Sequence, residues 1–400
     1  MHQFPRKLAA GAVFASALFV GGCETLGYYS QAISGQLHLL AQREPVADVL
    51  RDIGARGEPS ASDATLRGQL LLSQRLLEFA KSRLQLDPGN RYRTYVALEA
   101  PAVVWNLFAA PSLSLEAETW CYPFVGCAPY RGYFDRSRAV AFREKLAGRG
   151  FDTYLGEVAA YSTLGWFDDP LLSTFLSWPE ANLARLLFHE LAHSRVWLKG
   201  DVAFNESFAS FVGGEGMAQW LAGENKAADY SAYLDRRRDW QRLLVLLEAA
   251  RDALRELYQA GLPGAAKLAA KQRLLDETRA CYHSNREALG GGRYDRLMQE
   301  LNNAFLVSLA TYSEHEGAFA ALFSDSDQRW AVFYAAVEDL ARSPESERDA
   351  QLVRLSEKQV QHASNNERAD DVQCESFTSH GFDRETAGAE HDDIRRSRDG

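Results

Sequence analysis

Two histidines four residues apart, with a glutamate directly after the first, constrain this chain more than any other feature. His189, Glu190 and His193 form the pattern H-E-x-x-H. On a helix, side chains at positions i and i+4 leave the same face one turn apart. Two imidazoles in that arrangement can bind one zinc ion, and the glutamate can reach a metal-bound water. The pattern therefore predicts a Zn2+ site, and a hydrogen-bonded pair of core histidines is the alternative.

The ends and the apolar face of this segment predict a helix. Ser177 and Glu180 have the spacing of a capping box at its start, and Lys199 with Gly200 forms a basic last turn and a C′ glycine at its end. Both imidazoles leave the helix opposite an apolar face that we expect to be buried. That face consists of Ala184, Leu187, Phe188, Leu191 and Leu198.

A catalytic zinc site needs a third protein ligand and one open position. No histidine follows directly, because residues 194–199 read Ser-Arg-Val-Trp-Leu-Lys. The carboxylates within reach are Asp201, Glu206 and Glu215. The chain after Gly200 is long enough to double back, since extended residues span about 3.3 Å each. A second apolar helix starting at Glu206 would then present that carboxylate to the metal.

The other two carboxylates fit less well. Asp201 would lie roughly 9 Å along the first helix from the metal, and Glu215 about 13 Å beyond Glu206 on the second. Glu206 is therefore the predicted third ligand. Asn205 could cap the second helix and orient Glu206, and the small Ala209 would permit close packing of the two helices.

Several stretches carry a resemblance to known families. The pattern at 189–193, followed by Asn-Glu-Ser-Phe-Ala at 205–209, resembles the gluzincin metallopeptidases. The spacer is shorter than in the aminopeptidase N group, so that likeness is one of motif type. Over roughly residues 25–343 the chain more closely resembles a bacterial family of predicted aminopeptidases, many of them lipoproteins. The matching stretches are Tyr28-Tyr29 with Gly35-Gln36, Val104-Trp105-Asn106, residues 130–134, residues 160–167, both zinc motifs, and Asn302-Asn303-Ala304 with Tyr312.

The resemblance implies a zinc-dependent peptidase with a peptide substrate. Zinc on His189, His193 and Glu206 would activate a water, and Glu190 would act as general base. Related zinc peptidases use a distant tyrosine to stabilise the oxyanion. Tyr312 is the candidate for that role here, with a packed helical tyrosine as the alternative.

The segment before the zinc helix is the candidate substrate strand. In zincins an edge strand just before the zinc helix pairs with the substrate backbone. Residues 151–161 are the predicted strand in that place here, and an ordinary sheet strand is the alternative. Tyr161, Ser162 and Thr163 could line the substrate cleft. An aminopeptidase must also hold the free amine of its substrate, and Glu157 is the candidate carboxylate for this role. The alternative is that Glu157 is an ordinary exposed residue of the strand. An envelope endopeptidase therefore remains an alternative.

A function without catalysis is the hypothesis from a different class. A lipoprotein could use the zincin fold only as a scaffold for partners, but the intact ligands and Glu190 argue against this. Another divalent metal in place of zinc stays open. The net charge of −10, without a Lys/Arg-rich run, gives no support for nucleic acid as a partner.

Residues 1–22 have the pattern of a lipoprotein signal peptide. Arg6 and Lys7 precede an apolar run that is too short to span a bilayer. Val-Gly-Gly before Cys23 resembles a lipobox, whose cysteine becomes the acylated membrane anchor. Glu24 then predicts the outer membrane, with the protein facing the periplasm. A plain secretory signal with an incidental cysteine is the alternative.

The other cysteines fit an oxidising compartment. Cys121 and Cys127 flank a turn-forming loop, which favours a local disulfide over a metal role because no histidine is near. Cys281 and Cys374 are interpreted as incidental.

The predicted fold class is α+β, mostly α. A zincin-like core, made of a small sheet and the H-E-x-x-H helix, is expected between N-terminal helices and a C-terminal helical bundle or hairpin. Aromatic and β-branched segments predict strands at 92–98, 103–108 and 151–161 and a hairpin at 121–134. The predicted segments are 23–90 (helical), 91–224 (catalytic core), 225–344 (C-terminal helices) and 345–400 (a charged, disordered tail).

Overall fold

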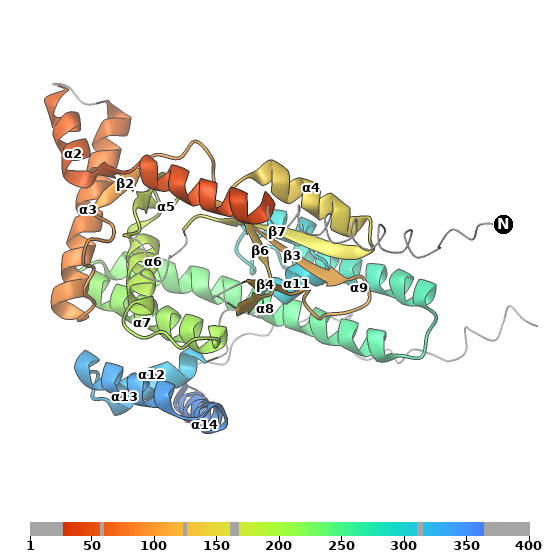
Figure 1. Ribbon diagram of the computed structural model, residues 1–400. Helices are drawn as coiled ribbons and strands as arrows, with labels where there is room; N and C mark the ends of the chain where they lie inside the picture. The colour runs from red at the N-terminus through yellow and green to blue at the C-terminus, as the bar shows by residue number, and fades with distance from the viewer. Residues whose placement is uncertain (1–26, 57–59, 123–125, 161–167, 310–314, 364–400) are drawn as a thin grey trace, which may run out of the picture. The chain divides into compact units, whose positions relative to one another are not determined.

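The computed structural model describes residues 27–56, 60–122, 126–160, 168–309 and 315–363 (Figure 1). Helices dominate and the sheets are small, which confirms an α+β fold that is mostly α. Within these residues, no helix combines the length and the apolar character that crossing a bilayer requires.

The chain divides into two compact units at places other than the predicted segment boundaries. One unit contains the described residues up to Arg236 and those from Glu300 onward, and the other contains Arg237–Gln299. The predicted N-terminal helices and catalytic core therefore fold together. The last third of the predicted C-terminal segment, from Glu300, also packs with them.

The N-terminal part of the first unit is helical, as predicted. Residues 27–41 form a helix, and α2 (Val46–Ala55) follows the short strand β1 (Glu44–Pro45). The long helix α3 (Ala61–Arg83) starts at a capping box in which Ser60 and Asp63 bond each other's backbone N–H.

An antiparallel sheet with the order β6-β3-β7 follows (Figure 1). Its central strand β3 (Val104–Pro111) pairs along its whole length with β7 (Phe151–Val158), and β6 (Arg131–Tyr133) pairs on the other side. Helices α4 (Arg136–Ala147) and α11 (Asn303–Leu309) both contact β3 and β7. Among the described residues β7 pairs only with β3, so it is an edge strand, as predicted.

The predicted hairpin at 121–134 is only partly correct. Strands β4 (Trp120–Tyr122) and β5 (Gly126–Ala128) form a hairpin that the disulfide Cys121–Cys127 crosses. The remaining residues leave this hairpin, because β6 pairs with β3 instead.

A second three-stranded sheet has the order β1-β2-β8. Strand β2 (Thr94–Val96) pairs in parallel with β8 (Leu171–Leu172), with Tyr95 opposite Leu171. The short helix α5 (Ser173–Leu176) continues from β8 towards the central helices. Parallel pairing joins segments far apart in sequence, and here it brings the chain before β2 beside the chain before β8.

Helices α6 (Glu180–His193) and α7 (Val202–Gly223) form the centre of this unit. The predicted buried face is confirmed for Ala184, Leu187, Phe188 and Leu191, which are almost fully buried. Its fifth residue, Leu198, lies beyond the end of the helix and is only partly buried. Both predicted ends of α6 are wrong. Pro179 stands at the N-cap without a side-chain cap, because Glu180 accepts hydrogen bonds from Trp220 and Lys226 instead.

Three more helices pack around α7 and contradict the predicted start of the tail. Helices α12 (Glu316–Asp325), α13 (Trp330–Arg342) and α14 (Glu345–Ala363) surround an aromatic cluster. The segment from 345 was expected to lack a core, but it is helical, contacts α12, and buries the side chain of Leu352 to 1% exposure. The aromatic cluster contains Phe208, Phe319, Phe323, Trp330, Phe333 and Tyr334.

The second unit contains most of α8 (Ala227–Gln259), together with α9 (Gly264–Ser284) and α10 (Asp295–Gln299). Two long helices joined by a short turn match the predicted helical hairpin. Cys281 is disulfide-bonded, so its interpretation as incidental is wrong.

Candidate metal centre

Three side chains from two helices meet as the sequence predicted. His189 and His193 lie in the last turns of α6, and Glu206 lies in the second turn of α7. Their possible ligand atoms all lie within 4.8 Å of one another. Within the described part of the chain, this is the group of His, Cys, Asp and Glu side chains that could hold a metal ion.

The distances between the donor atoms fit one tetrahedral ion. The two Nε2 atoms are 3.2 Å apart. Glu206 places Oε2 at 3.4 Å from His189 Nε2 and Oε1 at 3.5 Å from His193 Nε2. A tetrahedral zinc with bonds of about 2.0–2.1 Å separates its ligand atoms by about 3.3–3.4 Å. The two nitrogens, and each nitrogen with the Glu206 oxygen that faces it, therefore have close to the spacing that such an ion requires.

A short loop between the helices sets the position of Glu206. Helix α6 ends at His193, five residues before the predicted end, and Gly200 turns the chain with a φ of +88°. The side-chain amide of Asn205 accepts from the N–H of Leu198 at 2.8 Å and donates to its C=O at 2.7 Å. The loop is therefore tied to the first turns of α7.

Asn205 does not cap α7, contrary to the prediction. The cap is Asp201, which accepts from the N–H of Phe204 at 2.9 Å and forms an ion pair with Arg348 at 3.0 Å. Asn205 lies inside the helix and holds the loop instead. By holding the loop, Asn205 fixes the start of α7 and so the position of the next residue, Glu206.

Two glycines allow α6 and α7 to approach closely beside the histidines. A Cβ at Gly213 would lie 2.6 Å from the C=O of Arg185 and 3.1 Å from the Cβ of His189. A Cβ at Gly216 would lie 2.9 Å from the ring of Phe188. Ala209, which was predicted to permit this packing, is fully buried. The crossing also depends on the two glycines, which were not predicted to take part.

Burial and neighbouring charges keep His193 and Glu206 in the forms that bind metals. Burial, together with the charge of His189 and against the opposing charge of Glu206, lowers the pKa of His193 to about 4. Burial alone would raise the pKa of Glu206, but the hydrogen bond and charge of His189 and the charge of His193 hold it below its usual value. A neutral imidazole and an ionised carboxylate are the forms that coordinate a metal.

Glu190 lies next to the ligands but is not part of the group. Burial, opposed by the charge of His189 and aided by the negative charges of Glu206 and Asp169, raises its pKa to about 7. A carboxylate with a pKa near neutrality is suited to accept and return a proton.

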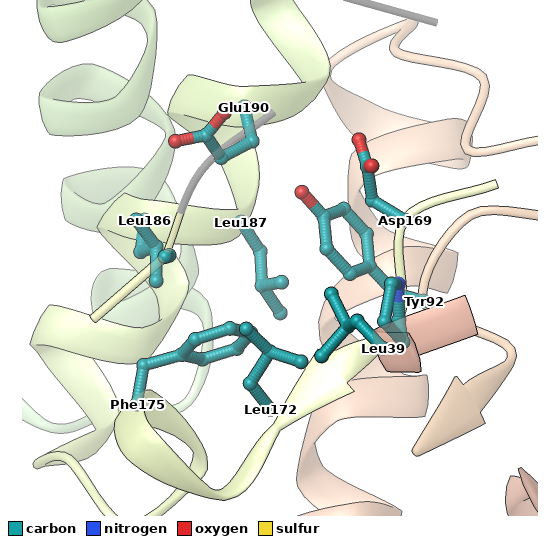
Figure 2. Close-up of a pocket in the computed structure, with 10 residues that line it drawn as sticks. Leu39, Tyr92, Asp169, Leu172, Phe175, Leu186, Leu187 and Glu190 are labelled. Carbon is teal, nitrogen blue, oxygen red and sulfur yellow. The ribbon is translucent and has the colours of Figure 1, made fainter. Parts of the chain in front are cut away.

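Glu190 also lines a small cavity together with Tyr92 and Asp169 (Figure 2). The sequence reading missed both of these residues. No local pattern marks them, because they meet through the parallel pairing of β2 with β8.

A further tyrosine that was not singled out is Tyr130. Its ring packs 5.5 Å from that of Phe108, and burial together with the negative charge of Glu206 raises its pKa. The signal that could have found it is its place in the family-like stretch 130–134.

Glu157 and the two carboxylates that fitted less well as ligands, Asp201 and Glu215, are not part of the metal group. Glu157 is exposed on β7, opposite Trp105 of β3. Glu215 accepts a hydrogen bond from Gln219 at 2.9 Å, and Asp201 caps α7. The remaining predicted residues lie outside the described part of the chain: Cys23, Tyr161, Ser162, Thr163 and Tyr312.

Comparison with known proteins gives one match. A family model described as "Putative aminopeptidase" matches residues 27–352, a range that contains both metal-binding helices. No curated protein and no solved structure matches the chain. Since the matched range covers most of the chain and agrees with the resemblance over residues 25–343, the chain belongs to this putative aminopeptidase family.

Proposed function

We propose that the protein is a zinc-dependent peptidase of gluzincin type with a zincin-like core. The observation that carries this proposal is the group of His189, His193 and Glu206, in which the two Nε2 atoms are 3.2 Å apart and each lies 3.4 or 3.5 Å from a different oxygen of Glu206. Two histidines and a glutamate leave a fourth position open, as in catalytic zinc sites. Membership of an aminopeptidase family supports peptides as the substrates.

Each residue has a distinct task in this mechanism. When bound, zinc supplies Lewis-acid activation of a water and of the peptide carbonyl. Glu190 accepts a proton from the attacking water and returns it to the leaving amine, which its pKa of about 7 favours at neutral pH. Asn205 holds the loop that sets Glu206, and Tyr312 is the proposed oxyanion donor.

The experiment that tests the proposal compares the wild type with Glu190→Gln. The soluble protein, starting after Cys23, is loaded with zinc and incubated with a diverse peptide library, and the products are identified by mass spectrometry. The wild type should cleave peptides, whereas the variant should keep its zinc and lose at least about 100-fold in turnover. Near-normal turnover of the variant would show that Glu190 is not the base.

The same library separates the two kinds of peptidase. Products shortened by one N-terminal residue support an aminopeptidase, in which Glu157 would hold the free amine, with Tyr161, Ser162 and Thr163 along the cleft. Internal cleavage would instead support an envelope endopeptidase. A wild type that binds no zinc and cleaves no peptide would point to a scaffold without catalysis.

We further propose that acylation of Cys23 anchors the protein to the outer membrane, facing the periplasm. The support is the lipoprotein signal pattern of residues 1–23, with Glu24 after the cysteine. Cys23→Ser should release the protein from the membrane fraction while its peptidase activity persists. A variant that still fractionates with membranes would require a different anchor.

A further inference from the structure

The cavity beside Glu190 is apolar except at one end. Three of its ten lining residues carry polar side chains, namely Tyr92, Asp169 and Glu190. Figure 2 shows the Tyr92 hydroxyl and the side chains of Asp169 and Glu190 in the upper part of the view, with Leu39, Leu172 and Phe175 below them. The two groups that accompany Glu190 are themselves buried, since Tyr92 and Asp169 are each 4% exposed.

The backbone holds Tyr92 in this position at a conformational cost. Its φ of +61° lies in the left-handed region, which is unusual for a bulky side chain. Its N–H donates to the C=O of Asp169 at 2.7 Å, and its own C=O accepts from the amide of Gln74 at 3.2 Å. Strain of this kind persists where the surrounding structure imposes it and often marks functional positions.

The hydroxyl of Tyr92 makes no hydrogen bond with any residue that the structure describes, and neither does the carboxylate of Glu190. Tyr92 as a residue is 4% exposed, but its hydroxyl is not among the described side-chain atoms that are both fully buried and without a partner, so a water can reach it. The cavity has a volume of about 10 Å³, close to the space that one water needs, and such a water requires two to four polar partners. Three polar side chains line the cavity.

We propose that Tyr92 and Asp169 hold one ordered water in this cavity and that this water positions Glu190. Tyr92 donates its O–H to the water, and the water donates to the carboxylates of Asp169 and Glu190. Both residues are positioning residues, because they act on the substrate only through Glu190. The proposal rests on the proposed function, since it assigns Glu190 the role of base.

The test removes only the hydroxyl. Tyr92→Phe keeps the ring in its packing, and Tyr282→Phe is the matched control. Tyr282 is fully buried in the second unit, which contributes none of the three metal-binding side chains, and its hydroxyl donates to Asp295 at 2.8 Å. Both variants are loaded with zinc and assayed with one peptide that the wild type cleaves, alongside their melting temperatures and zinc content.

Tyr92→Phe should lower kcat by about 10- to 100-fold, the size of outer-shell effects at metal sites. KM should stay within about twofold and zinc content should be unchanged, since neither substrate nor metal touches Tyr92 in this proposal. The control should keep the wild-type kcat even where its melting temperature falls. A kcat of Tyr92→Phe within about twofold of the wild type would overturn the proposal.

A double-mutant cycle tests whether the two residues act through one water. Asp169→Asn should also lower kcat. The double variant should have about the same kcat as the less active of the two single variants, because effects of residues in one network are not additive. If the loss of kcat in the double variant equals the product of the two single losses, the residues act independently and the proposal of a shared water is wrong. If Glu190→Gln loses hydrolysis but Tyr92→Phe keeps the wild-type rate, the proposed water is contradicted and the proposed function stands. Full activity of Glu190→Gln would remove both proposals.

Discussion

Some residues of the candidate site could be predicted from the sequence, and others could not. His189, Glu190, His193 and Glu206 follow from spacing, because helix geometry fixes how residues four apart lie and a short loop limits where the next helix can start. Tyr92 and Asp169 cannot be found in this way. They are 77 positions apart (169 − 92), and only the pairing of two short strands brings them together.

The decisive residue for the metal is Glu206. Glu206→Ala should lower zinc affinity by at least about 10- to 100-fold, since that range is reached even by outer-shell losses. Asp201→Ala and Glu215→Ala are the controls and should retain zinc, measured by titration with a competing chelator. Asp201→Ala should still cost about 1 kcal/mol of stability, because Asp201 caps α7.

The opposite pattern in that titration would contradict this ligand set. Loss of zinc in Asp201→Ala, with retention in Glu206→Ala, would mean that an aspartate coordinates the metal and that α7 is not the ligand helix.

At the scale of elements, the helices were predicted better than their ends. The apolar periodicity of α6 identified its buried face, but Ser177 with Glu180 and Lys199 with Gly200 proved to be misleading end signals. The helix ends at His193, and Asn205 holds the loop that follows by bonding both backbone groups of Leu198. A tertiary contact of this kind overrides local propensity and leaves no periodic signal.

The crossing of α6 and α7 depends on the absence of a side chain at Gly213. Gly213→Ala should force the helices apart near His189, because its Cβ would lie 2.6 Å from a backbone oxygen that cannot move freely. We expect a loss of about 1–3 kcal/mol in the free energy of unfolding, as for other overpacked sites, together with weaker zinc binding. Chemical denaturation and zinc titration measure the two effects.

The matched control for this substitution is Gly223→Ala. Gly223 lies at the end of the same helix, and a Cβ there would meet nothing within 4 Å. If Gly213→Ala binds zinc and unfolds like this control, the close crossing does not position the ligands.

Helix α14 was missed because its composition is charged and its few apolar residues are spaced widely. Leu352→Ala should cost about 2–5 kcal/mol, the usual range for a buried leucine, since Leu352 is 1% exposed. Its neighbour provides the control, because Val353 is 53% exposed and Val353→Ala should cost less than about 0.5 kcal/mol. Equal melting curves for the two variants would contradict the packing of α14.

At the scale of the whole molecule, the metal ligands all belong to one of the two compact units. A ligand that binds only the folded form stabilises it, by about 4 kcal/mol when its concentration is 1,000 times the dissociation constant. The second unit contributes none of the three ligands.

Zinc should therefore protect the two units unequally. Hydrogen exchange measured with and without zinc should slow in α6, α7 and the loop between them, and remain unchanged in residues 237–299. Glu206→Ala should abolish the difference. Equal protection of both units would show that they unfold as one body.

The early end of α6 also gives the site an electrostatic character of its own. Aligned peptide dipoles leave about half a negative charge at the C-terminus of a helix and half a positive charge at its N-terminus. His193 is the last residue of α6, and Glu206 follows the first turn of α7. The negative pole of α6 thus favours a cation by about 0.3–1 kcal/mol, whereas the positive pole of α7 favours the ionised form of the Glu206 carboxylate.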